Sequence, residues 1–283
     1  MMTFPVPVVA WTPSIGPGSQ PLEDEVLNTL DIPSEVATFR RPVTELNAPP
    51  EVVAEAIGVL EQLLAALRAT PYAAGQPARL SLCGLPAAVR AEVTALLGEG
   101  EVSIQGAAGL CAQETAFTGI WHLLGEGVDE IEAGGFPLAL RTEACARSAA
   151  AIGQAAEPPD DLMNAPALLH EVRTVSGAWA TPRAAHVINL SLLPVTPEDL
   201  SWLDEQLGRA GFSILSRGFG NCRITATRYP NTWWVQYFNA MEKLILNSIE
   251  IVDLPAVALA AEEDYTESIE RLAEWIDSVK SGM

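Results

Sequence analysis

Two long segments of the chain, 79–140 and 187–259, carry their apolar, glycine and proline positions in the same order. In each segment a short apolar alternation is followed by apolar residues at helical spacing, and then by several short alternating runs. The matched positions are Leu85–Pro86 with Leu193–Pro194, Leu97–Gly98 with Leu207–Gly208, Ser103–Ile104 with Ser213–Ile214, Cys111 with Cys222, Trp121 with Trp234, Ile131–Glu132 with Ile249–Glu250, and Pro137 with Pro255. Chance is a poor explanation for this conserved order, so we interpret the segments as two copies of one unit.

Each copy predicts a strand followed by a helix. The strands are marked by Leu80 and Leu82 in the first copy and by Ile188 and Leu190 in the second. Thr196 is the expected N-cap of the second helix, and Gly98 and Gly208 stand where C-cap glycines belong. The apolar faces of the two helices comprise Val89, Val93, Leu96 and Leu97, and Leu200, Leu203 and Leu207.

The rest of each copy predicts a meander of short strands separated by Gly or Pro–Asn. The expected strands are 101–106, 111–117, 119–124 and 128–133, matched by 212–217, 221–228, 232–239 and 244–252. A strand–helix–strand crossover is right-handed and most simply joins parallel strands, to which a meander adds antiparallel ones. We therefore predict an α+β fold of two tandem strand–helix–meander modules with mixed sheets.

Outside the copies the chain predicts packing helices and connectors. Residues 51–68 and 262–280 each carry an apolar stripe at helical spacing opposite acidic residues. Segments 13–50 and 152–186 are broken by prolines and are expected to be connectors. The predicted organisation is an N-terminal arm, linker and packing helix at 1–75, a first repeat at 76–150, a connector with a short helix at 151–186, and a second repeat with the C-terminal helix at 187–283.

Composition narrows the class of protein. The 283 residues are 49% hydrophobic, so the chain has material for a packed core, and 36 acidic against 16 basic residues give a net charge of −20. Nucleic-acid binding depends on Lys and Arg neutralising phosphates, so this acidity excludes it. No apolar stretch reaches the roughly 18–20 residues of a membrane span, and the N-terminus has no positive charge before its apolar run. We expect a cytoplasmic protein.

The reactive residues form no recognisable site. Cysteines stand alone at positions 83, 111, 145 and 222, and the histidines at 122, 170 and 186 have no metal-ligand spacing. Nucleotide-binding loops, GxSxG and HExxH are absent. We therefore predict no catalytic residue, no metal site, no cofactor and no enzyme activity. A cysteine nucleophile, such as Cys111 with His122, is an alternative for which the spacing supplies no orienting third group.

Three segments are candidates for partner binding. The first is an exposed turn of Gly16, Pro17, Gly18, Ser19 and Gln20, which could equally be a linker turn. The second contains Asp160, Asp161, Met163 and Asn164; its acids can cap a short helix, and Met163 with Leu168–Leu169 forms either core or an adaptable apolar surface. The third is the pair Trp233–Trp234, whose outward ring is either an interface anchor or covered by the 262–280 helix.

Several motifs together resemble the HupH/HyaF/HoxQ family of hydrogenase expression/formation proteins. They are IGPGSQP, LLGEGEVSI with the later Trp121, DDLMNAPALLHEV, VINLSLLP and SIEIVDLPAVALAAEED. The resemblance runs from about residue 15 to residue 278. It implies an accessory factor in the maturation of nickel–iron uptake hydrogenases, acting on the small, iron–sulfur subunit before its export by the twin-arginine route. It also implies a thioredoxin-like partner of the HyaE/HoxO kind.

The resemblance and the residues together favour a non-enzymatic chaperone for the small-subunit precursor. The acidic surface would attract the basic twin-arginine leader of that precursor. Two rival functions are a thiol-dependent redox or iron–sulfur transfer factor, which needs exposed and reactive Cys111 and Cys222, and a scaffold that bridges the large and small subunits. Open sheet edges could accept a partner strand or pair two copies of the chain, so a homodimer stays among the alternatives.

Overall fold

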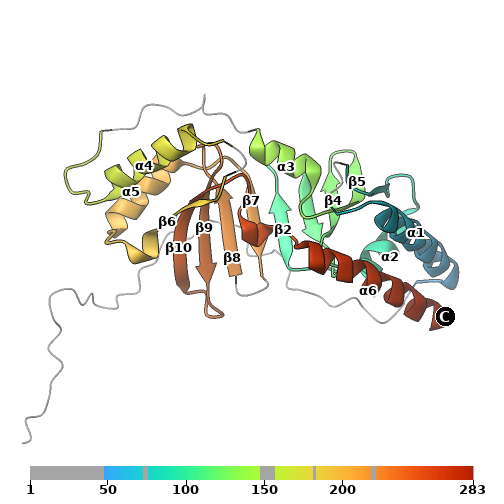
Figure 1. Cartoon of the computed structure of the whole chain (residues 1–283). Helices are drawn as coiled ribbons and strands as arrows, with labels where there is room; N and C mark the ends of the chain where they lie inside the picture. Colours follow the sequence, from blue (N-terminus) through green and yellow to red (C-terminus); the bar gives the residue numbers. More distant parts are fainter. Residues whose placement is uncertain (1–47, 73–75, 147–156, 181–182, 218–220, 283) are drawn as a thin grey trace, which may run out of the picture. The chain divides into compact units, whose positions relative to one another are not determined.

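The computed structural model describes residues 48–72, 76–146, 157–180, 183–217 and 221–282. Its ten strands form one sheet in the order β1-β5-β4-β3-β2-β7-β8-β9-β10-β6 (Figure 1). The first half of the sheet contains β1 (Arg79–Ser81), β2 (Val102–Gln105), β3 (Cys111–Glu114), β4 (Ile120–Gly125) and β5 (Val128–Ala133). The second half contains β6 (His186–Asn189), β7 (Ser213–Ser216), β8 (Asn221–Ala226), β9 (Thr232–Phe238) and β10 (Leu244–Ile251).

Six α-helices and two short 3-10 helices are described with the sheet. They are α1 (Pro50–Ala69), α2 (Ala87–Leu97), α3 (Leu138–Cys145), α4 (Ala165–Gly177), α5 (Pro197–Leu207), α6 (Glu262–Ser281), η2 (Leu190–Leu192) and η3 (Ala256–Ala258). The α+β class and the strands and helices predicted in each segment are confirmed, with boundaries that differ by a few residues.

The sheet differs from the predicted mixed sheets. Every neighbouring pair of strands in the described part of the chain is antiparallel, and the two halves are joined into one sheet by the pairing of β2 with β7. Strands β1 and β2 do run in the same direction, but β5, β4 and β3 lie between them. The connection through α2 therefore joins two parallel strands that are not neighbours, because three antiparallel strands of the meander lie between them. No two neighbouring strands in the described residues are parallel.

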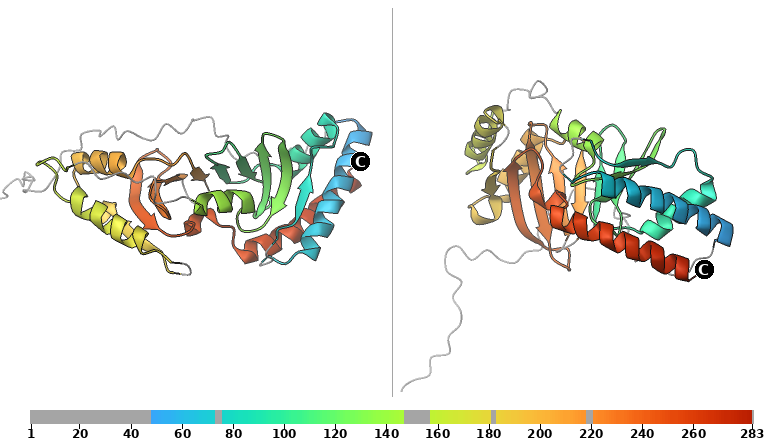
Figure 2. Two further views of the ribbon diagram at one scale, coloured as in Figure 1. Left: turned by 90° about the horizontal axis from the view of Figure 1, so that it is seen from above. Right: turned by 45° about the vertical axis from the view of Figure 1, so that its right-hand side comes forward.

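Helices cover one face of each half (Figure 2). In the first half α1, α2 and α6 enclose a core that includes Leu60, Leu96, Ile131 and Leu272. In the second half α4 and α5 enclose a core that includes Leu169, Leu203, Trp234 and Ile249. On the opposite face a third core runs across the centre of the sheet and includes Ile104, Ile214, Trp121, Trp233 and Leu140.

Helix α6 packs in the core of the first half of the sheet. It follows the second half along the chain, yet it packs against α1, and the Trp275 indole N–H donates to the Leu96 carbonyl at 2.9 Å. Its apolar stripe, with Tyr265, Leu272 and Ile276 buried, completes the core of the first half.

The ends of α2 and α5 have the same conformation. Gly98 and Gly208 end the two helices with φ of 63° and 55°, a left-handed region that a side chain disfavours, as expected for C-cap glycines. Thr196 is the N-cap of α5, as predicted, and it forms a capping box with Asp199. Pro86 precedes α2 without any side-chain cap.

The turn between β3 and β4 has the same hydrogen bonds as the turn between β8 and β9. The Thr115 hydroxyl accepts from the Phe117 N–H, and the Thr227 hydroxyl accepts from the Tyr229 N–H, both at 3.2 Å. The Ile120 carbonyl accepts from the Thr115 N–H at 2.8 Å, and the Thr232 carbonyl accepts from the Thr227 N–H at 3.0 Å. These bonds fix equivalent turns in front of β4 and β9.

A buried tryptophan follows each of these turns. The Trp121 indole N–H donates to the Gly134 carbonyl at 2.9 Å, and the Trp233 indole N–H donates to the Val252 carbonyl at 3.0 Å. Trp121 and Trp233 thus donate to equivalent acceptors, whereas Trp234, which the sequence match paired with Trp121, donates to Asn247 Oδ1.

Candidate functional site

The segment before α4 is organised by a buried carboxylate from another helix. Asp199 of α5 is fully buried, and its Oδ1 accepts from the backbone N–H groups of Met163, Asn164 and Ala165 at 3.0, 3.2 and 3.0 Å. Its Oδ2 accepts from the Thr196 N–H at 3.1 Å. These backbone hydrogen bonds hold the pKa of Asp199 below its usual value despite burial, which alone would raise it.

Asp199, and not Asp160 or Asp161, accepts the backbone hydrogen bonds at the start of α4. Asp160 and Asp161 were expected to cap the helix, but both are exposed, and the N-cap residue Asn164 makes no side-chain cap. The Asn164 side chain instead donates to the Pro194 carbonyl at 2.6 Å. The DDLMNAP motif therefore joins α4 to the start of α5. Of its apolar residues, Leu168 and Leu169 are core, whereas the Met163 residue is 66% exposed.

The two tryptophans at 233 and 234 are both covered. Trp233 is fully buried in the central core, and Trp234 lies among α4 and α5 with its indole N–H donating to Asn247 Oδ1. The coverage alternative is confirmed, but α4 and α5 supply the cover and not the 262–280 helix. Trp233 is 0% exposed and Trp234 is 8% exposed. The turn of Gly16, Pro17, Gly18, Ser19 and Gln20 lies outside the described residues.

An exposed apolar surface, of which the sequence indicated only Met163, lies at the outer end of the second half. We call Met163, Leu192, Leu193, Met241 and Ile245 the apolar edge; their exposures are 66, 80, 40, 82 and 60%. The Asn247 N–H donates to Ser191 Oγ at 2.8 Å, which places η2 beside the start of β10. The hydrogen bond from Asn164 to Pro194 brings Met163 to the same end. Exposed apolar groups gathered at one place are typical of interaction surfaces.

The sequence carried a signal for the apolar edge in the motif VINLSLLP. Ile188 and Leu190 of this motif are buried, but the chain turns into η2 directly afterwards and leaves Leu192 and Leu193 outside the core. Apolar residues beyond the end of a strand are not needed by its buried face.

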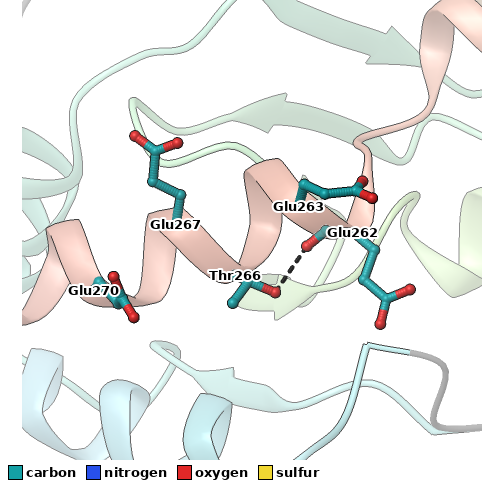
Figure 3. A pocket seen from close by; sticks show the side chains of 5 residues that line it. All are labelled: Glu262, Glu263, Thr266, Glu267 and Glu270. Atoms are coloured by element: carbon teal, nitrogen blue, oxygen red, sulfur yellow. Dashed lines mark hydrogen bonds between the residues drawn. The ribbon is translucent and has the colours of Figure 1, made fainter.

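A second exposed surface is acidic and lies along α6 (Figure 3). Glu262, Glu263, Glu267 and Glu270 line a surface pocket there together with Thr266, whose hydroxyl donates to the Glu262 carbonyl at 2.8 Å. All four glutamates are exposed. We call these four glutamates the acidic face; it would attract a basic segment at low salt.

One buried acid in the first half has no acidic counterpart in the second. Glu114 ends β3, is 5% exposed, and accepts from the Gly119 N–H at 3.0 Å. Burial raises its pKa to about 7. The residue that ends β8 is Ala226.

Cys222, one of the two thiols that the redox alternative needs, is buried. Cys222 is 2% exposed, and burial raises its pKa to about 12, so its thiolate is not populated at neutral pH. Cys111 is partly exposed, with its Sγ 3.1 Å from Gln105 Oε1, while His122 pairs with Asp129 at 2.8 Å. Within the described ranges no three His, Cys, Asp or Glu residues are grouped as metal ligands, and no helix there is long and apolar enough to cross a bilayer.

Comparison with known proteins supplies the family. Residues 162–279 match the family described as HupH hydrogenase expression protein, C-terminal conserved region. The hydrogenase expression/formation protein HupH of Rhodobacter capsulatus is 42% identical, over 94% of this chain and 96% of that protein. The hydrogenase expression/formation protein HoxQ of Cupriavidus necator is 41% identical, over 99% and 100%. A solved structure, the hydrogenase expression protein HupH from Thiobacillus denitrificans, is 28% identical, covers 41% of this chain and 96% of that one, and has a TM-score of 0.38.

Proposed function

Because the chain belongs to the HupH/HyaF/HoxQ family of hydrogenase expression/formation proteins, we propose that it is a maturation chaperone for a nickel–iron uptake hydrogenase. Its client is the small, iron–sulfur subunit in its precursor form, which still carries the twin-arginine leader. The HupH and HoxQ relatives are named for expression or formation and not for a reaction, in agreement with a non-enzymatic role. The observation that carries the proposal is the apolar edge, a surface suited to holding an unassembled subunit.

The two exposed surfaces have complementary tasks in this mechanism. The apolar edge covers apolar surface of the precursor, which would otherwise aggregate before it meets the large subunit. Methionine side chains such as Met163 and Met241 adapt to irregular partners, and both are more than half exposed. The acidic face steers the basic leader toward the chaperone, a long-range effect that salt screens. Both steps take place in the cytoplasm, before export.

The rival functions are less well supported. A thiol-dependent redox or iron–sulfur transfer factor needs an accessible thiolate, and the burial of Cys222 argues against one there. A thioredoxin-like HyaE/HoxO-type protein would supply redox chemistry as a separate partner. A bridging scaffold would bind the mature small subunit as tightly as the precursor, and this distinguishes it from a precursor chaperone.

We also propose that the chain contains two copies of one module, at 79–140 and 187–259. In support, the strand order from the outside inward is the same in both halves, β1-β5-β4-β3-β2 and β6-β10-β9-β8-β7. The bonds of Trp121 and Trp233 and the glycine C-caps at 98 and 208 point the same way. Pairing of β2 with β7 sets Ile104 opposite Ile214, where the axis relating two such copies would pass.

Co-purification with the small-subunit precursor, with and without its leader and over a salt series, tests the proposed function. The double variant Leu192→Ser/Leu193→Ser should lose binding at every salt concentration. Leu124→Ser, at a 47% exposed leucine of β4, is the matched control and should bind normally. If no form of the small subunit binds the wild type, the chaperone proposal is wrong.

The acidic face is tested by a change in salt dependence. Glu263→Gln/Glu267→Gln/Glu270→Gln, with or without Asp160→Asn/Asp161→Asn, should slow capture at low salt and leave binding at high salt unchanged. Glu51→Gln/Glu55→Gln, on the exposed side of α1, provides similar neutralisation elsewhere. An unchanged salt dependence in the α6 variant would remove the electrostatic part of the mechanism while leaving the apolar part intact.

A further inference from the structure

The outer pair of strands in the first half contains a buried ion pair. Glu132 of β5 lies opposite Arg79 of β1 and is 1% exposed. Arg79 Nη2 lies 2.8 Å from Glu132 Oε2, and Glu132 Oε1 accepts from the Leu138 N–H at 2.5 Å. A carboxylate at this depth needs such partners, because burial without them disfavours its charged form.

The outer pair of strands in the second half repeats the carboxylate without the cation. Glu250 of β10 lies opposite Trp233, just as Glu132 lies opposite Trp121. On its other side Glu250 faces Val187 of β6, at the position that Arg79 occupies in the first half. Glu250 forms no ion pair with any residue that the structure describes. Its pKa is raised by burial, and no cation opposes this.

The strand beside Glu250, at the position where Arg79 stands in the first half, is an exposed edge of the sheet. Val187 is 53% exposed, and β6 is the last strand of the sheet, with β10 as its one neighbour in the described residues. Valine is too short to shield the carboxylate as the arginine stem does in the first half. The outer edge of β6 also presents backbone groups to which another extended segment can pair.

We propose that Glu250 is the receptor for an arginine side chain from an extended segment of the bound client, lying along the outer edge of β6. The guanidinium takes the place that the Arg79 guanidinium has beside Glu132, and its aliphatic stem lies over Val187. Arginine fits better than lysine, because its planar fork can donate two hydrogen bonds to one carboxylate. The assignment rests on the proposed function for the identity of the protein that supplies the arginine.

Binding of the small-subunit precursor is the first test. Glu250→Gln removes the charge with little change of shape and should weaken binding by about tenfold. Val187→Arg fills the site from within the chain and should weaken binding to a similar extent, whereas Val187→Thr should not. If the wild type binds and all three variants bind equally well, the receptor assignment is wrong and the chaperone proposal stands.

A double-mutant cycle checks the geometry without any client. Val187→Arg should raise the thermal midpoint by about 2–4 °C through a new ion pair with Glu250. The same substitution in a Glu250→Gln background should give no such gain. An equal gain in both backgrounds would mean that an arginine at this edge does not reach Glu250, which overturns the assignment.

A synthetic probe keeps the two proposals separable if the precursor fails to bind. The probe is a labelled peptide of residues 76–84 of this chain, which contains Arg79, with Cys83→Ser to prevent oxidation. Fluorescence anisotropy should show binding to the wild type, and about tenfold weaker binding to Glu250→Gln or when citrulline replaces Arg79. Equal binding of all forms would overturn the receptor. If Glu250→Gln instead dissociates a dimer of the chain in sedimentation, a second copy is the occupant and the client assignment is wrong.

Discussion

The first and second halves of the sheet share hydrogen bonds at Thr115 and Thr227 and at Trp121 and Trp233, but they differ in the residues at their outer ends. In the first half Arg79 forms an ion pair with Glu132, and α1 and α6 cover one face of the sheet. In the second half the corresponding pair is Val187 and Glu250, and Met163, Leu192, Leu193, Met241 and Ile245 are exposed at that end. Large exposed apolar side chains described elsewhere are Leu124 and Leu259. The outer end of the first half thus stabilises the fold, and the outer end of the second half, as we propose, binds a client.

The largest expected effect on stability is at the buried tryptophans, which both halves have. Trp121→Ala and Trp233→Ala each remove a fully buried indole and its hydrogen bond to a carbonyl, so each should lower the free energy of unfolding by about 3–5 kcal/mol. Urea denaturation measures both. Losses of similar size are expected if the two tryptophans play the same part. A loss below about 1 kcal/mol at either position would break the comparison.

A slightly smaller effect on stability is expected at the buried carboxylate of Asp199, in the second half. Asp199→Ala leaves the N–H groups of Met163, Ala165 and Thr196 without their acceptor, and should cost about 2–4 kcal/mol. The folded-state pKa of Asp199 is lowered, so its contribution is present above the unfolded pKa and is lost as pH falls through the folded value. The wild type should therefore approach the variant in stability under strong acid, as urea titrations at pH 7 and at about pH 2 would show.

Glu114 offers a prediction of opposite sign in the first half. Its folded-state pKa is raised from 4.5 to about 7, so the folded protein loses stability as pH rises through this window. Glu114→Gln keeps the shape without the charge and should be more stable than the wild type at pH 8, by about 2–3 kcal/mol. Thermal unfolding at pH 5 and pH 8 tests this. A wild-type protein with the same stability difference from the variant at both pH values would contradict it.

The smallest effect on stability is expected at the apolar edge. Leu192→Ser/Leu193→Ser should change the free energy of unfolding by less than about 0.5 kcal/mol, because the two side chains are largely outside the core. Loss of client binding without loss of stability would show that the apolar edge serves binding and not folding. A drop of more than about 2 kcal/mol would instead mean that these leucines belong to the packing of η2.

Features that depend on neighbouring residues could be predicted from the sequence. The capping box of Thr196 and Asp199 and the C-cap glycines at 98 and 208 require only a few adjacent residues to agree, and the structure has all of them. The burial of Val89, Val93, Leu96 and Leu97 follows from helical spacing in the same way. These parts of the fold are local, so the sequence contains their full specification.

Features that depend on distant partners could not be predicted in the same way. The stripe of Tyr265, Leu272 and Ile276 shows that α6 is buried on one side, but spacing does not say that its partner is α1, about two hundred residues earlier. The second role of Asp199, at the start of α4, likewise depends on how two helices dock. Leu192 and Leu193 of the apolar edge were missed because they continue an apolar run whose strand ends just before them.

The position of α6 has a consequence for protein synthesis. A ribosome releases α1 and the first five strands early, but the core that they share with α6 stays incomplete until the last twenty helical residues, Glu262–Ser281, have emerged. Strand β2 likewise waits for β7 before its second edge is paired. The nascent chain therefore carries an unfinished apolar surface through most of its translation, and a transcript truncated before α6 should yield a product that proteases remove.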